Sequence, residues 1–335
     1  MKARTGILSF AFAWLLGCQG RQSALDPAGP QSGRIHSLTQ MFVWISGLVF
    51  ILVLAFLLYA LWRGRKNTDR TPGEIREQKR AAWVVAVSTV ITTLILTGYL
   101  INSVAKGRAI STMPDKTKTL EIDAIGHQWW WEFHYANPSA QARVMTANEI
   151  HVPVGRPVRV ITTSRDVIHS FWVPNLHGKT DMIPNHENVT WIQADRPGVY
   201  RGQCAEYCGL QHAHMAFLVV AEPEKDFDAW IGQQRQPALA PANADLQRGQ
   251  QVFLSGPCVI CHRIRGTSAL GQAAPDLTHF GSRHAIAAAT VPNTAGYLAG
   301  WITDSQHLKP GNRMPPVSLE PRDMQSLLNY LESLK

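Results

Sequence analysis

The chain has 335 residues, of which 45% are hydrophobic and 17% are charged. This length and composition allow more than one folded domain and exclude a disordered, acidic or collagen-like polypeptide. The formal net charge of +8 is of the kind that nucleic-acid-binding proteins carry. Most of the excess positive charge, however, lies in residues 1–37 and 63–80, which flank hydrophobic segments. We therefore predict no nucleic-acid partner.

The N-terminus has the pattern of an export signal. Two basic residues precede a mostly apolar stretch from Ile7 to Leu16, and Gly17 and Cys18 follow it. A Cys directly after Leu-Leu-Gly resembles the processing box of bacterial lipoproteins, in which this Cys becomes lipidated. We predict a signal segment over residues 1–18 with lipidation at Cys18. An ordinary signal with an incidental Cys is the alternative.

Two long segments without Lys, Arg, Asp or Glu follow, from Ile35 to Trp62 and from Ala81 to Ala105. Each exceeds the roughly 20 apolar residues that a bilayer core requires. We predict a transmembrane hairpin over residues 35–105, with helices at about 38–62 and 82–105. A buried hairpin in a soluble protein is the alternative, but Trp and Tyr residues near the segment ends favour a membrane.

The loop between these segments is rich in Lys and Arg, and the positive-inside rule places it in the cytoplasm. Everything after Lys106 then lies on the outer side of the membrane. Disulfides are permitted in that compartment. We predict a multi-pass protein of the bacterial cytoplasmic (inner) membrane, whose external domains face the periplasm.

Short runs rich in β-forming residues, punctuated by Pro, Gly and Asn, occupy the first external domain, residues 117–222. The runs are residues 119–125, 149–154, 157–163, 188–194 and 216–221. Regularly spaced short strands without a long helical pattern predict an antiparallel sandwich or barrel.

Soft metal ligands gather near the end of this domain. They are Cys204, Glu206, Cys208, His212 and Met215 within twelve residues, and His169 about 35 residues upstream. Thiolate, imidazole and thioether together favour copper, and two coppers bridged by two thiolates would use all of them. A Cys204–Cys208 disulfide, a structural zinc site or simple core residues are the alternatives, although zinc rarely recruits Met. His214 is out of step with the spacing and is interpreted as a surface or packing residue.

At this point the sequence resembles subunit II of the haem–copper cytochrome c oxidases, in its binuclear copper (CuA) domain. The resembling stretches are residues 126–131 (Gly-His-Gln-Trp-Trp-Trp), 166–174, 179–184, 196–200 and 202–215. With the two preceding spans, the resemblance covers residues 35–222. It implies a cupredoxin-like, all-β sandwich on a two-helix membrane hairpin.

The resemblance also implies the roles of single residues. Cys204 and Cys208 would bridge the coppers, His169 and His212 would be terminal ligands, Met215 a weak ligand, and Glu206 would bind through its backbone carbonyl. The Glu206 carboxylate would reach a Mg²⁺ ion at the boundary with subunit I. Trp129 would receive electrons from the donor, Trp131 would be a packing residue, and Asp166 would orient His169.

Two positions depart from the family pattern. Arg80, three residues before Trp83, stands where the family usually has a Glu that serves a proton channel. A role of this chain in proton uptake is therefore not predicted. Asn185 replaces the usual Gly after Ile-Pro, and a left-handed turn tolerates Asn.

After Glu222 the composition turns to Pro, Ala and Gln, which predicts a flexible linker over residues 223–243. A short helix at 245–254 then leads into Cys258-Val259-Ile260-Cys261-His262, the motif for covalent attachment of haem c. The two thiols add to the haem vinyl groups, and the His ligates the iron. A thioredoxin-like redox pair is the alternative.

Residues 244–335 resemble an all-α class I cytochrome c. The resemblance implies that Met314 is the distal axial ligand of the haem iron opposite His262, and that Pro275 lies near His262. Met324 is the rival ligand, but it has a packing position on a closing helix from Arg322 to Leu334. Contact between the first and last helices is expected at Gly249, Phe253 and Tyr330.

Together these motifs predict an electron-transfer protein. The chain would pass electrons from cytochrome c or a bc-type complex through haem c and CuA to the haem of subunit I, where O₂ is reduced to water with proton pumping. Subunits I and III are the expected partners. The alternatives are the equivalent subunit of a CuA-type nitric oxide reductase and a membrane-tethered protein that stores or delivers copper. Nitrous oxide reductase is disfavoured because it carries a second, His-rich copper cluster and no such spans.

Overall fold

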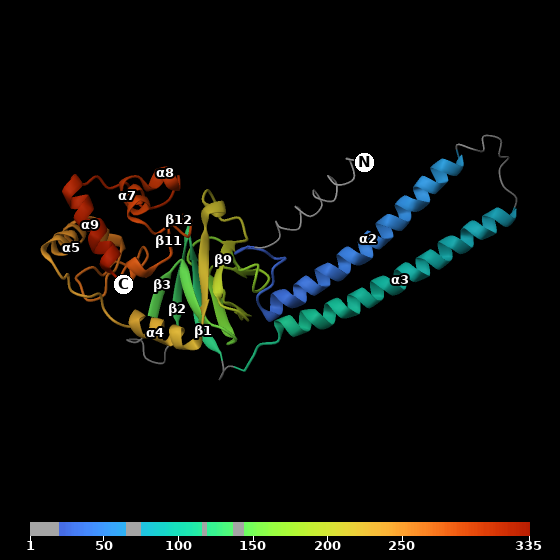
Figure 1. Ribbon diagram of the computed structural model, residues 1–335, viewed down its shortest axis with the longest axis horizontal. Helices are drawn as coiled ribbons and strands as arrows, with labels where there is room; N and C mark the ends of the chain where they lie inside the picture. The colour runs from blue at the N-terminus through green and yellow to red at the C-terminus, as the bar shows by residue number, and fades with distance from the viewer. Residues whose placement is uncertain (1–19, 65–74, 116–118, 137–143) are drawn as a thin grey trace, which may run out of the picture. The chain divides into compact units, whose positions relative to one another are not determined.

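The computed structural model describes residues 20–64, 75–115, 119–136 and 144–335. These residues form two compact units (Figure 1). One is the segment 33–112, and the other contains the described residues before 33 and after 112. The predicted signal segment with Cys18 lies outside the described residues, so its processing and lipidation stay predictions.

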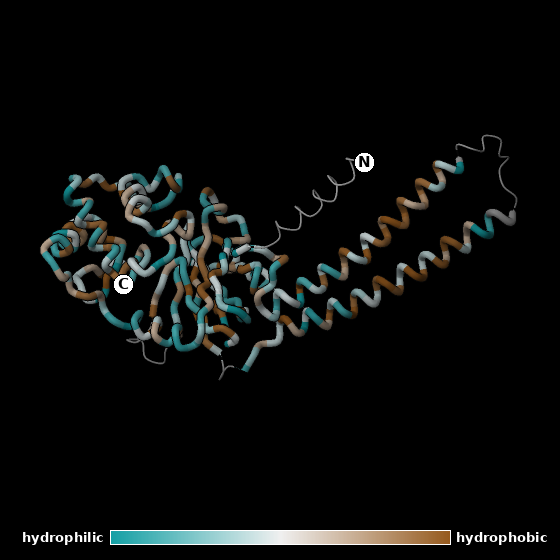
Figure 2. Tube along the Cα trace, in the orientation of Figure 1, coloured by the Kyte–Doolittle hydropathy of each residue, from teal (hydrophilic) through white to brown (hydrophobic). Residues whose placement is uncertain are grey.

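The first unit is a helical hairpin of α2 (Pro30–Gly64) and α3 (Ile75–Ser111). The helices touch where the Phe42 and Tyr99 rings lie 6.3 Å apart and where Arg34 donates to the Ala109 carbonyl at 3.3 Å. Hydrophobic residues dominate the middle of both helices (Figure 2). Among the described residues, these two helices are long and apolar enough to cross a membrane. Both extend beyond the predicted ends, because the apolar run marks only the part that fits a bilayer core.

A β sandwich follows, here called the sandwich domain, with two five-stranded sheets among the described residues. The first sheet has the order β3 (Val144–Ala147), β2 (Trp130–Tyr135), β1 (Leu120–His127), β5 (Val158–Ser164) and β8 (Asn188–Ile192). The second has the order β4 (Glu149–Pro153), β10 (Ala216–Glu222), β9 (Gly198–Cys204), β6 (His169–Trp172) and β7 (Thr180–Met182). All five predicted runs are strands.

The sandwich is mixed, so the prediction of a purely antiparallel arrangement is corrected. Strand β1 pairs parallel with β5, and β4 pairs parallel with β10. Parallel neighbours need a crossover connection. The chain supplies one by leaving the first sheet after β3, adding β4 to the second sheet, and returning to the first at β5.

Aromatic rings fill the space between the sheets. Trp131, Phe133, Phe171 and Phe217 are at most 1% exposed. The Phe217 ring centroid lies 4.7 Å from that of Trp131 and 4.8 Å from that of Phe171. Burial of each ring contributes about 1.5–3 kcal/mol. Trp131 is therefore a packing residue, as predicted.

Helix α4 (Glu224–Gln234) occupies the first half of the predicted linker, which corrects that prediction. Phe227 and Ile231 are buried against the sandwich, and the Trp230 ring stacks on His151 with centroids 4.1 Å apart. The spacing of these three residues gives the helix one apolar face. Residues 235–243 carry no helix or strand, and the Ala238 amide donates to the Arg265 carbonyl at 2.9 Å.

The C-terminal helical domain contains α5 (Ala244–Ser255), α6 (Cys258–Cys261), α7 (Ala295–Thr303), α8 (Ser305–Leu308) and α9 (Pro321–Ser333). Helices α5 and α9 cross at Gly249, as predicted: a Cβ atom there would lie 2.0 Å from the Ser326 carbonyl oxygen and 2.7 Å from Tyr330 Cβ. Asn243 caps α5 by accepting from the Leu246 amide at 2.9 Å.

A short ribbon of β11 (Ala285–Ile286) and β12 (Val291–Pro292) lies within this mostly helical domain. The turn between its strands contains Ala287, Ala288 and Ala289, with φ angles of 54°, 56° and 52°. Alanine rarely adopts this left-handed conformation. The carbonyl of Ala288 accepts from the Ala216 amide of the sandwich domain at 3.1 Å.

Candidate metal and haem sites

The predicted copper ligands come together at one end of the sandwich. Strand β6 opens with His169, and strand β9 ends with Cys204. These strands pair, with Phe171 opposite Cys204. The loop after β9 carries Cys208, His212 and Met215, and it returns to the sheet where the Cys204 amide donates to the Met215 carbonyl at 2.9 Å. Residues about 35 apart in the sequence therefore share one site, here called the sulfur cluster: His169, Cys204, Cys208, His212 and Met215 with the Glu206 carbonyl.

The ligand atoms of the sulfur cluster face one another. The two Sγ atoms lie 3.7 Å apart, and both cysteines are free. Cys204 Sγ lies 3.8 Å from His169 Nδ1 and 3.2 Å from the Glu206 carbonyl oxygen. Cys208 Sγ lies 3.6 Å from His212 Nδ1 and 3.8 Å from Met215 Sδ. Two thiols, two imidazoles and a thioether around one centre are a donor set that fits copper.

Asp166 fixes the orientation of the His169 ring. Its Oδ1 pairs with His169 Nε2 at 2.9 Å, which leaves Nδ1 facing Cys204. The carboxylate also accepts from the backbone amides of Gln128 at 2.7 Å and Val167 at 2.8 Å. Carboxylate–imidazole pairs of this kind typically hold metal-binding histidines in one tautomer. This geometry matches the orienting role predicted for Asp166.

The electrostatics of the cluster favour a thiolate. A hydrogen bond from Cys208 and another from His169 hold the pKa of Cys204 well below its usual range. Burial acts to lower the pKa of His169, but its hydrogen bonds to Cys204 and Asp166 outweigh burial and raise it. Because metals bind the thiolate form of cysteine, an environment that favours the Cys204 thiolate also favours binding of a soft cation.

Glu206 presents its backbone and its side chain to different surroundings. The carbonyl faces Cys204 Sγ, whereas the carboxylate is 43% exposed and pairs with Lys179 at 3.3 Å. The magnesium ion predicted at this carboxylate stays a prediction. His214 is exposed and pairs with Gln211 at 3.0 Å, which agrees with its interpretation as a surface residue.

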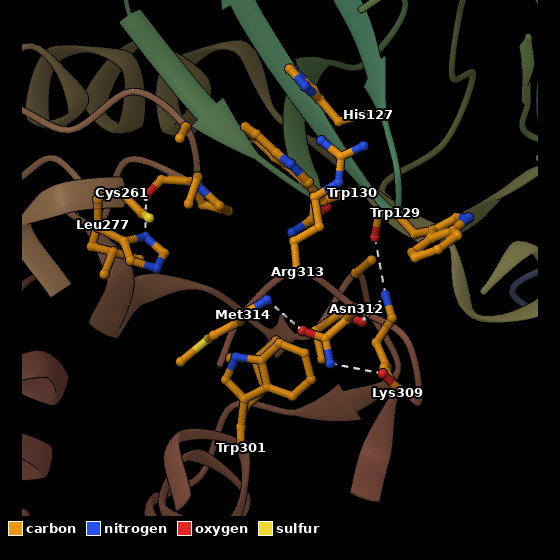
Figure 3. Close-up of a pocket in the computed structure, with 18 of the residues that line it drawn as sticks. His127, Trp129, Trp130, Cys261, Leu277, Trp301, Lys309, Asn312, Arg313 and Met314 are labelled. Carbon is orange, nitrogen blue, oxygen red and sulfur yellow. Dashed lines mark hydrogen bonds between the residues drawn. The ribbon is translucent and has the colours of Figure 1, made fainter. Parts of the chain in front are cut away.

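The residues predicted to hold haem line one cavity of about 340 Å³, whose walls come from the helical domain and from residues 127–130 of the sandwich domain (Figure 3). Cys258, Cys261, His262 and Met314 all line it. Met314 projects toward the part where Cys261 lies. Its walls are mostly apolar, and they include Trp301. An apolar cavity with two free thiols, an imidazole and a thioether fits a covalently attached haem.

Both candidate axial ligands are held by backbone contacts. His262 Nδ1 pairs with the Pro275 carbonyl at 2.8 Å, so Nε2 is the nitrogen available to iron. Burial lowers the pKa of His262, which keeps the imidazole neutral. The Met314 amide donates to Asn312 at 2.8 Å, and its carbonyl accepts from Gln306 at 3.1 Å. Met324 packs against the helical core on α9, as predicted.

Trp129 touches both sites. Trp129 is one of the residues that line the haem cavity, and its indole nitrogen donates to the Cys208 carbonyl at 2.9 Å. Its own carbonyl accepts from Lys309 of the helical domain at 3.0 Å (Figure 3). No motif in the sequence singles out Lys309, which is 2% exposed. Burial lowers the pKa of this lysine to about 7.

Comparison with known proteins identifies the family. A model described as "Cytochrome C oxidase subunit II, periplasmic domain" matches residues 138–222, and one described as "Cytochrome c" matches residues 246–335. Cytochrome c oxidase subunit 2 of Alkalihalophilus pseudofirmus is 35% identical over 334 residues, covering 98% of this chain and 96% of that protein. The chain belongs to the cytochrome c oxidase subunit 2 family.

The chain is also similar to a second relative and to a solved structure. The subunit 2 of Bacillus sp. PS3 is 31% identical over 291 residues, covering 82% of this chain and 80% of that protein. A crystal structure of the periplasmic domain of subunit II from Bradyrhizobium japonicum is 32% identical, covering 37% of this chain and 97% of that chain with a TM-score of 0.34.

Family membership confirms the predicted resemblance, and it makes this chain a subunit of a haem–copper oxidoreductase. The first match contains the sulfur cluster, and the second contains the predicted haem ligands Cys258, Cys261, His262 and Met314. Trp129 lies outside both matched regions. The two long apolar helices and the periplasmic-domain match indicate a membrane-anchored protein with an external domain.

Proposed function

We propose that this chain is the subunit through which electrons enter a haem–copper terminal oxidase. It would take electrons from a cytochrome c or a bc-type complex and deliver them, by way of haem c and CuA, to the haem of subunit I, where O₂ is reduced with proton pumping. When bound, haem c and the copper pair supply two one-electron redox centres. The observation that carries this proposal is the position of Trp129, which contacts both sites.

In the helical domain, Cys258 and Cys261 would anchor the haem, and His262 and Met314 would be its axial ligands. Burial favours the neutral form of His262 by lowering its pKa, and the Pro275 carbonyl fixes the ring. It holds the Met314 segment through Asn312 and Gln306. Ligands that are fixed before the redox change need little rearrangement during it.

In the sandwich domain, Cys204 and Cys208 would bridge the two coppers. His169 and His212 would bind through Nδ1, the nitrogen that faces a cysteine sulfur in each case. Met215 and the Glu206 carbonyl would complete the set. The cysteines, His169 and Met215 are at most 3% exposed, so the surrounding sandwich excludes water from the sulfurs.

The remaining partners follow from the same family. The helical hairpin would place the chain beside subunits I and III in the bacterial cytoplasmic membrane, with the sandwich and helical domains on the periplasmic side. The Glu206 carboxylate would contribute to a Mg²⁺ site shared with subunit I. Lipidation at Cys18 would add a second membrane anchor.

Metal analysis and electron paramagnetic resonance of the full-length chain test this function. We expect two coppers and one haem iron per chain, with a seven-line, mixed-valence copper signal. Cys208→Ser should abolish the binuclear signal, and Met215→Leu should leave a perturbed centre. His214→Gln, which changes an exposed neighbour, is the matched control. A four-line mononuclear signal from the wild-type chain would overturn the assignment of a binuclear copper site. Unchanged copper content in the Cys208→Ser chain would overturn it as well.

A further inference from the structure

A second group of metal-binding side chains lies where the sandwich and helical domains meet. Glu149 and His151 project from the same face of β4, because they are two residues apart on a strand. His284 comes from the helical domain, immediately before β11. One ligand atom from each of the three residues lies within 4.8 Å of the other two. None of these residues belongs to the sulfur cluster or the haem cavity.

The Glu149 carboxylate sits between the two imidazoles. Its Oε1 lies 3.2 Å from His151 Nε2, and its Oε2 lies 3.1 Å from His284 Nδ1. The side chains of Glu149 and His151 are 7% and 8% exposed, whereas that of His284 is 49% exposed. The group is therefore enclosed on the side of the sandwich and open to solvent at His284, which leaves room for a water ligand.

A second carboxylate, that of Glu222, orients the buried His151 ring. Glu222 Oε1 pairs with His151 Nδ1 at 2.9 Å, so Nε2 is the nitrogen that faces Glu149 and His284. The ring is also clamped by stacking on Trp230 of α4. A carboxylate that orients a histidine whose other nitrogen binds a metal is the usual outer arrangement of protein zinc sites.

The donor set selects the class of ion. Two imidazoles, one carboxylate and an open position are typical of Zn²⁺ sites, whereas hard cations prefer all-oxygen ligands and Cu(I) prefers sulfur. The charge also balances, because one divalent cation neutralises the carboxylates of Glu149 and Glu222 when both imidazoles are neutral. Burying the Glu149 carboxylate, which is 7% exposed, without such compensation is costly.

We propose that Glu149, His151 and His284 bind one Zn²⁺ ion that joins the sandwich domain to the helical domain. Two of the ligands belong to one domain and the third to the other, so a single ion would hold the two domains together. This site goes beyond the proposed electron transfer and does not depend on it.

Zinc titration of the full-length chain, loaded with haem and copper and stripped of other ions by a chelator, tests the site. Competition with a chromophoric zinc indicator should give one tight Zn²⁺ ion per chain. His284→Gln and His151→Gln should each weaken zinc binding at least about tenfold, and Glu222→Gln should weaken it by roughly 10–100-fold. The matched controls are His307→Gln and His186→Gln, which change exposed histidines of the helical and sandwich domains.

Two further measurements separate loss of the site from loss of the fold. The haem spectrum and the near-infrared copper band should be unchanged in every variant. His284→Cys, which keeps a zinc ligand at this position, should retain tight binding. Zn²⁺ should slow hydrogen exchange in residues 285–292 of the wild-type chain but not of the His284→Gln chain.

The proposal fails if the wild-type chain takes up no more zinc than the His284→Gln chain. It also fails if the His307→Gln and His186→Gln controls lose as much affinity as the His284→Gln chain does. Co²⁺ gives an independent reading: visible bands of a four- or five-coordinate ion should appear in the wild-type chain and disappear in the His151→Gln chain.

Discussion

Asp166 contributes to the sulfur cluster although it touches no sulfur atom. Its carboxylate holds His169 through Nε2 and accepts two backbone amides at the same time. The orientation of His169 therefore depends on an acceptor that a simple count of metal ligands omits.

Asp166→Asn should weaken copper binding by roughly 10–100-fold, because the amide replaces one acceptor oxygen with a donor and loosens the imidazole. Competition with a copper chelator measures this, and the haem spectrum should not change. Asp181→Asn, which alters an exposed partner of Lys179, is the control. Equal copper retention in the two variants would contradict the orienting role.

Trp129→Phe should slow electron transfer from haem to copper by more than about tenfold, equivalent to about 1.4 kcal/mol of barrier. The substitution removes the hydrogen bond to the Cys208 carbonyl while both metal sites stay intact. Flash-induced reduction of the haem, followed at the copper band, gives the rate. Trp130→Phe is the control, because Trp130 lines the same cavity but stacks on His127. If both variants slow electron transfer equally, Trp129 has no specific role in it.

The amino-acid sequence is most informative where chemistry is encoded in local spacing. Cysteines, histidine and methionine within one loop, and the Cys-x-x-Cys-His motif, can be recognised from the order of the residues alone. Lys309 cannot, because its burial depends on contacts with Trp129 and Ala287 in other parts of the fold. The same holds for His284, whose partner Glu149 is 135 residues away.

At the scale of elements, composition does not predict a strand whose residues have little β-forming character. Strand β9 contains Gly198, Gly202 and Arg201, yet it lies between β6 and β10. Gly202 is required because a Cβ atom there would lie 2.2 Å from the Phe217 ring. Composition does not predict helix α4 (Glu224–Gln234), because the Pro-, Ala- and Gln-rich stretch typical of a linker begins at its C-terminal end.

Gly249→Ala should destabilise the helical domain by about 1–3 kcal/mol, because the new methyl group meets the backbone of α9. Gly300→Ala is a matched control in α7, where a Cβ atom meets nothing within 4 Å and helix propensity improves by up to about 1 kcal/mol. Thermal unfolding followed at the haem absorbance should show a lower Tm for the first variant only. A similar Tm for both would show that α5 and α9 can separate without cost.

At the scale of the whole molecule, polar contacts as well as the polypeptide chain join the sandwich domain to the helical domain. Lys309 donates to the Trp129 carbonyl, Gln211 donates to the Pro310 carbonyl at 2.8 Å, and the His284 amide donates to Glu149 at 3.0 Å. One of these contacts titrates in an accessible range. Burial lowers the pKa of Lys309 from 10.5 to about 7.

Docking of the helical domain should strengthen as the pH rises from about 7 to about 10.5. In this window an exposed lysine holds a proton that the buried one has lost, so the docked state binds fewer protons and is favoured at higher pH. The effect has a ceiling of about 5 kcal/mol and should vanish in Lys309→Met. Distances between spin labels, one on each domain, measure docking. Lys225→Met, an exposed change on α4, should keep the wild-type pH dependence of docking. Loss of the pH dependence in this variant would contradict its assignment to Lys309.

The left-handed turn at Ala287–Ala289 has a consequence for any cytochrome released from this chain. Each alanine in that conformation costs about 1–2 kcal/mol, and the Ala216 amide of the sandwich domain helps to offset the cost. A helical domain cut free at residues 235–243 would lose that amide and relax at the turn. It would then have to re-form the turn each time it binds the sandwich domain. In the joined chain, the contact with the sandwich domain keeps the turn in its bound conformation.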